Sequence, residues 1–376
     1  MYGFRIPRDG SRALGGAGKE RAMTNMKPRI VAWELTRRCH LKCAHCRAAS
    51  ADGGTGEELT TEQIVGVMDD IVAVGRPMLI LTGGEPMLRA DLYEIIESAR
   101  ERGLAVAVAP SGTLIGESEA RRMVALGVHR VSVSLDGPTA AMHDEFRGVA
   151  GAFQGALRGC EACRKAGLPF QINTTLTVSN IERLEEMVTL AARLGAAAFH
   201  TFSPVPVGRG MSLARAEIAA SLSREFLERL LKVYESAPIP VRVTCAPQFY
   251  RLLRERTGTG AAGREKAVGH DSFSHGCIAG RAYAFIGAEG NVQPCGYLPL
   301  SCGNVLAEGF GEIWEKSEVL RNLRDARTLK GKCSKCGMIG ICGGCRARAY
   351  AVTGDYLAAD PFCTYSADER NQEDGK

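Results

Sequence analysis

Three cysteines within eight residues, Cys39, Cys43 and Cys46, form the stretch of this sequence best suited to chemistry. Three residues separate the first pair and two separate the second, so a loop of this spacing can turn three thiolates toward one point. Three thiolates are the ligand set of an iron–sulfur cluster with one iron left open. A structural zinc site needs a fourth ligand nearby. His40 and His45 lie inside the loop, where the short gaps leave them little freedom to supply it.

The remaining cysteines are unevenly placed along the chain. Of 14 in total, eight lie between Cys277 and Cys363, and Cys160, Cys163 and Cys245 are the others outside the first group. The first 27 residues lack the continuous apolar stretch of a signal peptide, so disulfides are the less expected use. Cys160 and Cys163 fall within a helical pattern and are interpreted as core residues. These observations predict a cytoplasmic protein that holds metal clusters.

Composition and charge exclude several other classes of protein. A chain of 376 residues predicts one large domain plus a smaller one. The net charge of +5 comes from 47 basic and 42 acidic residues, which is too balanced for a nucleic-acid binder, and no run of Lys and Arg forms a stripe. No apolar run reaches the length of a membrane span. The charge is compatible with an anionic small substrate.

Strand and helix patterns alternate six times in the first part of the chain. Strands are expected at 30–36, 78–81, 105–109, 130–135, 170–177 and 197–202, and helices at 60–74, 91–102, 117–126, 153–166 and 181–194. Such alternation predicts an α/β fold with a parallel sheet covered by helices. Six units fall short of a full eight-stranded barrel.

Polar and glycine-containing turns follow these strands directly. They are the cysteine loop, Gly83-Gly84-Glu85-Pro86, Ser111-Gly112 and Asp136-Gly137-Pro138. Ligands gather at the carboxyl ends of parallel strands, so we expect these turns to converge on one face. Glycines let the backbone approach a ligand closely, and Glu85 offers a carboxylate to an ammonium group. Ser132, Ser134 and Asp136 alternate along one strand and therefore share a face.

The spacing Cys-x3-Cys-x2-Cys resembles that of the radical S-adenosylmethionine (radical SAM) superfamily. This resemblance implies a partial (β/α)6 TIM-like barrel that is open on one side. It also implies that Cys39, Cys43 and Cys46 hold a [4Fe-4S] cluster whose open iron binds the amino and carboxylate groups of S-adenosylmethionine. Electron transfer from an external donor of the ferredoxin or flavodoxin type then splits this cofactor into methionine and a 5′-deoxyadenosyl radical.

The resemblance also implies roles for residues near the cluster. Gly83, Gly84 and Glu85 match the turn that binds the methionine amine, although an ordinary glycine turn is the alternative. Further candidate cofactor contacts are Ser111 (where the family more often has Asn), Ser134, Asp136, Arg147 and Asn173. Asp136-Gly137-Pro138 has the alternative of a plain turn. His200 and Arg209 are candidate substrate contacts, with a packed histidine and a solvated loop arginine as the alternatives.

The last third of the chain carries a dense array of cysteines. A helix is expected at 223–234, a short strand at 241–244, a mobile linker at 257–272, a hairpin at 282–295 and a helix at 313–323. On chemistry alone, two zinc sites fit the cysteine count as well as iron–sulfur clusters do.

This region resembles the SPASM extension of radical SAM enzymes, which carries auxiliary [4Fe-4S] clusters. The resemblance implies one cluster on Cys333, Cys336, Cys342 and Cys363. It implies another on Cys277, Cys295 and Cys345, whose fourth ligand is Cys302 or is absent. The gap between Cys342 and Cys345 is one residue shorter than the family's usual gap. The chain thus divides into a flexible leader (1–28), a radical SAM core barrel (29–215), a helical bridge with linker (216–272), a SPASM domain (273–366) and a tail (367–376).

Six short stretches are similar to the haem-biosynthesis branch of the superfamily, in particular to heme b synthases of the siroheme-dependent pathway: 31–34, 46–48, 171–175, 293–298, 345–350 and 353–357. This similarity implies a tetrapyrrole substrate and oxidative decarboxylation of two propionates of iron-coproporphyrin III to vinyl groups. The alternatives are a sister tetrapyrrole enzyme (didecarboxysiroheme deacetylase or haem d1 biosynthesis), a SPASM-type peptide maturase, and a non-enzymatic metal scaffold. Only 29 residues precede the first expected strand, too few for a maturase's peptide-recognition domain. A scaffold makes no use of the Gly-Gly-Glu-Pro turn.

Overall fold

One ten-stranded sheet organises the computed structural model, which describes residues 26–50, 56–212, 215–257 and 276–365. The strand order is β10-β9-β8-β1-β2-β3-β4-β5-β6-β7. The bounds are Ile30–Glu34 (β1), Met78–Thr82 (β2), Ala105–Val108 (β3), Arg130–Ser134 (β4), Phe170–Thr175 (β5), Ala198–Phe202 (β6), Val241–Thr244 (β7), Tyr283–Ile286 (β8), Asn291–Gln293 (β9) and Gly303–Asn304 (β10). Strand β8 and strands β1 to β7 are parallel, while β9 and β10 add an antiparallel extension.

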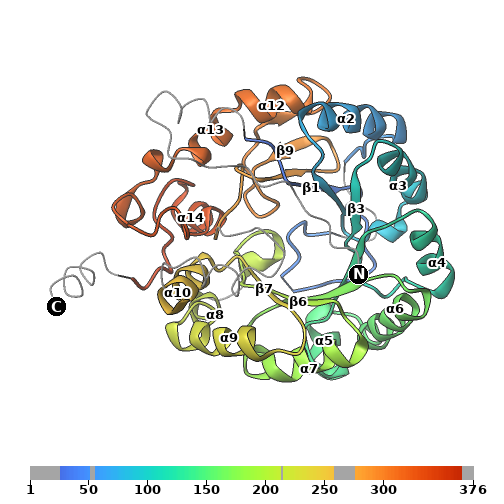
Figure 1. The fold of residues 1–376 in the computed structure, drawn as a ribbon, viewed down its shortest axis with the longest axis horizontal. Coiled ribbons are helices and arrows are strands. Elements are labelled where there is room, and N and C mark those ends of the chain that lie inside the picture. The colour runs from blue at the N-terminus through green and yellow to red at the C-terminus, as the bar shows by residue number, and fades with distance from the viewer. Residues whose placement is uncertain (1–25, 51–55, 213–214, 258–275, 366–376) are drawn as a thin grey trace.

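Helices form a ring outside the sheet, as Figure 1 shows. Their bounds are Thr61–Val74 (α2), Leu92–Glu101 (α3), Glu117–Ala125 (α4), Ala140–Arg147 (α5), Ala152–Ala166 (α6), Leu184–Leu194 (α7), Arg215–Ala220 (α8), Arg224–Ser236 (α9), Pro247–Thr257 (α10), Phe310–Lys316 (α12), Glu318–Arg324 (α13) and Arg346–Thr353 (α14). The outward faces of the strands pack against this ring with fully buried apolar side chains such as Val133, Ile172 and Phe199. The predicted α/β partial barrel is confirmed.

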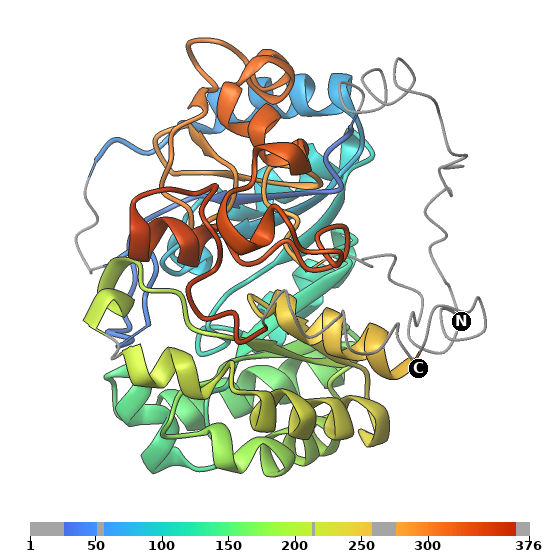
Figure 2. The same cartoon turned by 90° about the vertical axis from the view of Figure 1, so that its left-hand side faces the viewer.

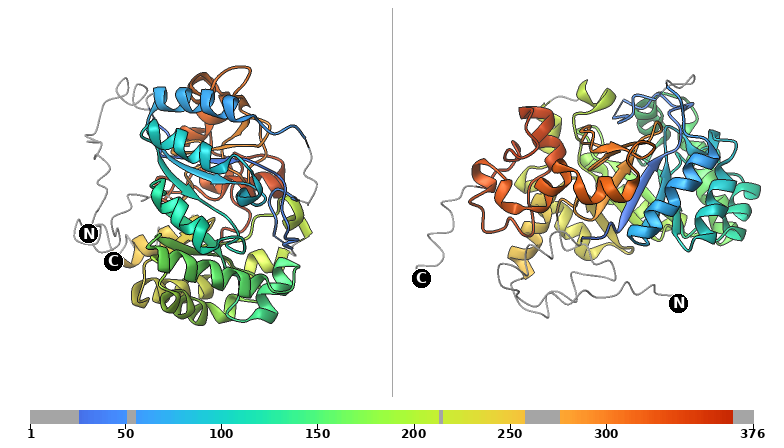
Figure 3. Two further views of the ribbon diagram at one scale, coloured as in Figure 1. Left: turned by 90° about the vertical axis from the view of Figure 1, so that its right-hand side faces the viewer. Right: turned by 90° about the horizontal axis from the view of Figure 1, so that it is seen from above.

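Four strands from outside the expected six, β7 to β10, join the same sheet. β7 continues the sheet beyond β6, and β8 from the cysteine-rich region pairs with β1 in parallel. One sheet therefore includes strands from both sides of the predicted domain boundaries at residues 215 and 272. These boundaries stay predictions. Its edges are β7 and β10, so the barrel does not close, and the orange and red C-terminal segments face the viewer across this gap in Figure 2. Figure 3 shows the same segments beside the barrel.

Local sequence signals account for most of the elements. Thr60 accepts a hydrogen bond from the Gln63 N–H, and the Gln63 side chain accepts one from the Thr60 N–H, so a capping box starts α2. The hairpin expected at 282–295 is present as β8 and β9. The prediction of a single helix at 313–323 is wrong. The structure has two helices, α12 and α13, because the backbone of Ser317 between them is extended (ψ 124°).

Several expectations fall outside the described residues. The predicted leader lies almost entirely within 1–25, and the predicted linker and tail lie largely within 258–275 and 366–376. Cys160 and Cys163 are fully buried on α6, which confirms their interpretation as core residues. In the part of the chain that the structure describes, every helix is too short or too polar to cross a lipid bilayer.

Candidate active site

Polar side chains line the inner face of the sheet where β4, β5 and β6 lie side by side. Ser132 and Ser134 are partly exposed, whereas their neighbours on β4 point outward and are fully buried. The strand register places Ser134 beside Asn173 and Asn173 beside His200. The alternation predicted for β4 therefore holds, and three strands contribute polar groups at one level of the barrel.

Hydrogen bonds fix two members of this polar row. Nε2 of Gln171 donates to Oδ1 of Asn173 (2.9 Å) and lies 3.1 Å from Nδ1 of His200. Nε2 of His200 lies 2.6 Å from Oγ1 of Thr244 on β7. His200 is thus a hydrogen-bonded residue on the inner wall of the barrel.

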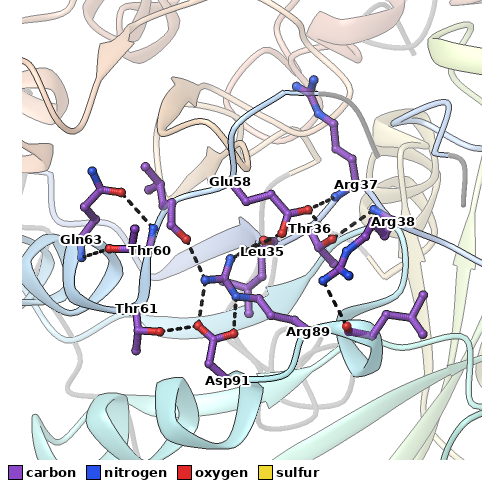
Figure 4. Close-up of polar contacts among 12 residues, drawn as sticks. Leu35, Thr36, Arg37, Arg38, Glu58, Thr60, Thr61, Gln63, Arg89 and Asp91 are labelled. Carbon is purple, nitrogen blue, oxygen red and sulfur yellow. Dashed lines mark hydrogen bonds and ion pairs between the residues drawn. The ribbon is translucent and has the colours of Figure 1, made fainter. Parts of the chain in front are cut away.

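The cysteine loop starts directly after β1, and its base is held by the buried Arg89 (Figure 4). The Arg89 guanidinium donates to the carbonyl oxygens of Leu35 and Leu59, both at 2.7 Å, and pairs with Asp91 (2.7 Å). Glu58 accepts hydrogen bonds from the Thr36 hydroxyl (2.5 Å) and the Arg37 N–H (3.2 Å). Because this base is fixed, the loop leaves the strand in one direction.

Each sulfur of the loop accepts a hydrogen bond from a described residue. The donors are the Leu41 N–H to Cys39 (3.4 Å), the Ser50 N–H to Cys46 (3.4 Å) and Nη1 of Arg147 to Cys43 (3.5 Å). Hydrogen bonds to the sulfurs are a usual feature of iron–sulfur sites, since thiolate ligands carry negative charge. Burial raises the pKa of the Cys39 thiol to about 11, so a thiolate there needs a bound cation. This donor set fits an iron–sulfur cluster.

The two histidines of the loop have other partners. Nε2 of His40 lies 2.7 Å from Oγ1 of Thr113. His45 stacks on Phe146 with ring centroids 4.7 Å apart, and burial lowers its pKa to about 4. Within the described ranges, no three His, Cys, Asp or Glu side chains are grouped as ligands of one single metal ion.

The two glycines after β2 pack against the backbone of the cysteine loop. A Cβ on Gly83 would lie 2.6 Å from the carbonyl oxygen of Thr36, and one on Gly84 would lie 2.4 Å from that of Arg38. The Gly84 N–H donates to Thr36 (2.7 Å) and the Glu85 N–H donates to Arg38 (2.8 Å). We expected these glycines to admit a ligand; the contact that the structure describes is with the loop itself.

Glu85 is fully buried and is oriented by neutral donors. Its Oε2 accepts hydrogen bonds from the N–H (2.9 Å) and Oγ (2.5 Å) of Ser111, and its Oε1 accepts one from the Met87 N–H (3.2 Å). Burial raises the pKa of this carboxyl, and the Ser111 hydrogen bonds oppose the rise. Through Thr113 the Ser111 hydroxyl is linked to His40 of the cysteine loop. A cationic ligand group would relieve the cost of burying this carboxylate.

Asp136 and Arg147 form a buried ion pair beside the cysteine loop. Oδ1 of Asp136 accepts from the Thr175 N–H (2.8 Å), and the Asp136 N–H donates to Nδ1 of His143 (3.0 Å). Burial works to raise the pKa of Asp136, but the charges of Arg147, His45 and His143, with the hydrogen bond from the Thr175 N–H, together hold that pKa below its ordinary value. Since Arg147 also donates to Cys43, the pair connects β4 to the cluster site.

Arg209, expected to meet a substrate carboxylate, braces the cysteine loop. Its Nε donates to the carbonyl oxygen of Cys43 (2.9 Å) and its Nη1 to that of Ser50 (2.7 Å). Nη2 is buried without a hydrogen-bond partner among the described residues. Two of its three nitrogens are therefore committed to the loop backbone.

Two further groups of cysteines gather in the C-terminal region. One cavity is lined by Cys333, Cys336, Cys342 and Cys363, together with Ile339, Gly343 and Gly344. The Gly344 N–H donates to the Cys342 sulfur (3.4 Å), as expected for an anionic ligand atom. This cavity brings together the four cysteines of the first predicted auxiliary set.

Cys277, Cys295 and Cys345 form the other group. Burial raises the pKa of the Cys295 thiol to about 12, and the neighbouring thiols of Cys277 and Cys345 add to the rise. Cys302 lies elsewhere, in the main core, where its thiol donates to the carbonyl oxygen of Leu300 (3.9 Å). The structure thus separates Cys302 from the three cysteines that it was expected to complete.

Comparison with known proteins agrees with this geometry. The model of the Radical SAM superfamily matches residues 33–191, and that of SPASM, an iron-sulfur cluster-binding domain, matches residues 277–337. The AdoMet-dependent heme synthase of Methanosarcina barkeri is 44% identical over 345 residues, which cover 92% of this chain and 98% of that protein. This chain belongs to the radical SAM enzymes and, within them, to the AdoMet-dependent heme synthase family.

More distant relatives and a solved structure complete the comparison. The Fe-coproporphyrin III synthase of Methanosarcina barkeri is 31% identical over 362 residues, covering 91% of this chain and 89% of that protein. The crystal structure of Streptococcus suis SuiB bound to S-adenosylmethionine aligns with a TM-score of 0.71 at 17% identity, covering 92% of this chain and 80% of that one. This likeness shows the fold. The enzyme's cofactors are S-adenosylmethionine and [4Fe-4S] clusters, including those of the SPASM domain.

Sequence reasoning missed an aromatic and charged group between the cysteine loop and the C-terminal region of the enzyme. Arg47 donates to the buried Glu34 (2.5 Å), and its guanidinium lies 4.4 Å from the ring centroid of Phe285. Burial raises the pKa of Tyr297, and the thiols of Cys245, Cys295 and Cys46 add to the rise. The Tyr297 N–H donates to the Cys295 sulfur (3.5 Å), and a Cβ on the adjacent Gly296 would lie 3.3 Å from Cδ of Arg47. The position of Arg47 directly after Cys46 could have indicated that this arginine lies near the cysteine loop.

Proposed function

We propose that this enzyme forms haem b by oxidative decarboxylation of two propionates of iron-coproporphyrin III. The observation that carries the proposal is the match to an AdoMet-dependent heme synthase over nearly the whole length of both chains. The identity to this heme synthase is 44%, whereas the identity to the Fe-coproporphyrin III synthase is 31%, which is 13 percentage points lower. The sister reactions are therefore the second choice.

The cluster and cofactor contacts are assigned as follows. Cys39, Cys43 and Cys46 hold the radical SAM cluster, and Glu85, oriented by Ser111, binds the methionine ammonium group. Gly83 and Gly84 hold the Glu85 turn against the cysteine loop, as their backbone contacts support. Ser134 and Asn173 contact S-adenosylmethionine from the inner wall of the barrel. Arg147 acts at the same site through its hydrogen bond to Cys43, and Asp136 acts there through its ion pair with Arg147.

The proposed reaction balances for each propionate. When bound, the cluster and S-adenosylmethionine supply a 5′-deoxyadenosyl radical, which takes one hydrogen atom from the propionate β-carbon to give 5′-deoxyadenosine. The substrate then loses carbon dioxide and one electron, and a vinyl group remains. One electron enters from a donor of the ferredoxin or flavodoxin type, and one electron leaves the substrate for each propionate.

The auxiliary clusters are the proposed acceptor of the electron that leaves the substrate. Arg47, which follows Cys46, lies against Gly296, which follows Cys295, and this contact supports a short path between the barrel and the C-terminal region. Serine variants of Cys333 and Cys336 are expected to keep cleaving S-adenosylmethionine while vinyl formation falls. Full turnover in both variants would rule out the cluster of these cysteines as acceptor.

The function itself is tested by offering two tetrapyrroles separately. The anaerobic enzyme is incubated with S-adenosylmethionine, a reductant and either iron-coproporphyrin III or didecarboxysiroheme, and the products are weighed by mass spectrometry. We expect iron-coproporphyrin III to lose two carboxyl groups and didecarboxysiroheme to remain unchanged. The reverse result would assign the chain to a sister reaction.

A further inference from the structure

Cys245 occupies an unusual position at the carboxyl end of a barrel strand. It is the residue directly after β7, which is one edge of the sheet. Its backbone has φ of +61°, and Ala49 is the other non-glycine residue with positive φ among those described. Residues with a side chain adopt this conformation rarely, and such positions are concentrated at functional sites. The backbone at Cys245 is therefore held by its surroundings.

The neighbours of Cys245 are other cysteines. Cys245 and Cys295 are partly buried and pack against one apolar cluster, and the buried Cys345 belongs to that cluster. Burial raises the pKa of the Cys245 thiol well above its ordinary value, and Cys345, Cys295 and Cys277 add to the rise. None of the four forms a disulfide. Cys245, Cys295 and Cys345 therefore meet at one place between β7 and the C-terminal region.

One buried ion pair fixes the backbone of both Cys245 and Cys345. Arg348 and Asp360 are fully buried and lie 2.9 Å apart. Arg348 donates through Nη1 to the carbonyl oxygen of Cys245, and Asp360 accepts from the Cys345 N–H (2.8 Å). The Nε of Arg348 has no hydrogen-bond partner among the described residues. The chain thus uses one polar pair to bring together two cysteines that are distant in sequence.

A purely structural role for Cys245 does not account for these contacts. Cys160 and Cys163 show what core thiols look like in this chain: they lie on the helix α6, fully buried within the main apolar core. Cys245 has a left-handed backbone, a buried cation at its carbonyl oxygen and two other cysteines at the same apolar cluster. These are the surroundings of a ligand.

We propose that Cys245 is the fourth thiolate ligand of the auxiliary [4Fe-4S] cluster held by Cys277, Cys295 and Cys345. All four irons of that cluster then have protein ligands. A metal site with no open coordination position cannot bind substrate. The role left for this cluster is electron transfer. The inference depends on the auxiliary cluster and not on the identity of the tetrapyrrole, so it can fail while the proposed function holds.

The test uses the full chain with Cys39, Cys43 and Cys46 replaced by alanine, so that only auxiliary clusters load. Into this parent we introduce Cys245→Ala, or Cys302→Ala as the matched control, because Cys302 is also a buried thiol of the C-terminal region. Iron, sulfide and electron paramagnetic resonance spectra of the reduced proteins are measured with and without 2-mercaptoethanol.

We expect the parent and the Cys302→Ala control to have about eight irons per chain and spectra that 2-mercaptoethanol leaves unchanged. Cys245→Ala should lose about four irons, or keep them and show one spectrum that the added thiol shifts. Should Cys245→Ala misfold, Cys245→Ser should change the spectrum of one cluster, since a serine oxygen replaces sulfur. A spectrum of the parent that already shifts with thiol, or Cys245 variants identical to the control, would overturn the proposal.

Discussion

Ser111 donates two hydrogen bonds to the same oxygen of Glu85, one from its N–H at 2.9 Å and one from its hydroxyl at 2.5 Å. This carboxylate is fully buried, and no salt-bridge partner for it exists among the described residues. Its orientation is therefore set before any ligand binds, while its charge is left for a ligand to balance. Preorganisation of this kind lowers the cost of binding a cationic group.

Replacing Glu85 by Gln should weaken binding of S-adenosylmethionine by about 10- to 100-fold, because a hydrogen bond to a charged group contributes about 1.5–3 kcal/mol. Equilibrium dialysis with the anaerobic enzyme measures this affinity. Ser111→Ala should have a smaller effect, since the Ser111 N–H still orients the carboxylate. Iron content should stay unchanged in both variants. If Glu85→Gln binds the cofactor as tightly as the natural enzyme does, the carboxylate has no role in binding.

Gly84→Ala should prevent the radical SAM cluster from loading. The new Cβ would lie 2.4 Å from the Arg38 carbonyl oxygen and 2.9 Å from that of Arg37, and backbone atoms cannot move aside as a flexible side chain can. The cysteine loop must then shift, and we expect a loss of about four irons per chain.

Gly66→Ala is the matched control for this substitution. Gly66 lies in α2 with no atom within 4 Å of an added Cβ, so alanine there should stabilise the helix by about 0.5–1 kcal/mol and leave the iron content unchanged. The iron content of both variants is measured, and we expect only Gly84→Ala to have lost iron. A Gly84→Ala enzyme with full iron content would show that the close contact tolerates a methyl group.

His143 should make the enzyme less stable in mild acid. Burial, with the charge of Arg147, lowers its pKa from 6.5 to about 4. As the pH falls, His143 is protonated in the unfolded chain before it is protonated in the folded enzyme. The free energy of unfolding is therefore highest above pH 6.5 and decreases as the pH falls from 6.5 to 4. The loss between pH 7 and pH 5 should be about 2 kcal/mol.

His143→Asn isolates this contribution, since asparagine offers an oxygen to the Asp136 N–H and does not titrate. The unfolding temperature of the anaerobic enzyme is measured at pH 7 and pH 5. Between pH 7 and pH 5, the unfolding temperature of the natural enzyme should fall further than that of the variant. Equal losses in the two proteins would mean that another group causes the acid sensitivity.

Local spacing was enough to predict the features that depend on neighbouring residues. The cysteine loop, the turn before Glu85 and the hairpin of β8 and β9 each require only a few consecutive residues, and all three were expected. Ser317, whose extended backbone separates α12 from α13, interrupts a pattern that is helical on both sides, so periodicity alone could not find the break.

Long-range pairing explains what the sequence did not reveal. β8 joins the barrel because it pairs with β1, which lies far away in the chain, and no local pattern specifies this partner. For the same reason Arg147 could be proposed as a cofactor contact, but its position between Asp136 and Cys43 could not be predicted. Cys245 was overlooked because its strand was expected, but the pairing of that strand with β6 was not.

The central claim is that a hydrogen atom leaves the propionate β-carbon for the 5′-deoxyadenosyl radical. The most direct measurement uses iron-coproporphyrin III with deuterium at the β-carbons of its propionates, incubated anaerobically with the enzyme, S-adenosylmethionine and a reductant. We predict haem b, with deuterium in the 5′-deoxyadenosine that accompanies each vinyl group. Formation of haem b with unlabelled 5′-deoxyadenosine, or cofactor cleavage with no change in the porphyrin, would contradict the account.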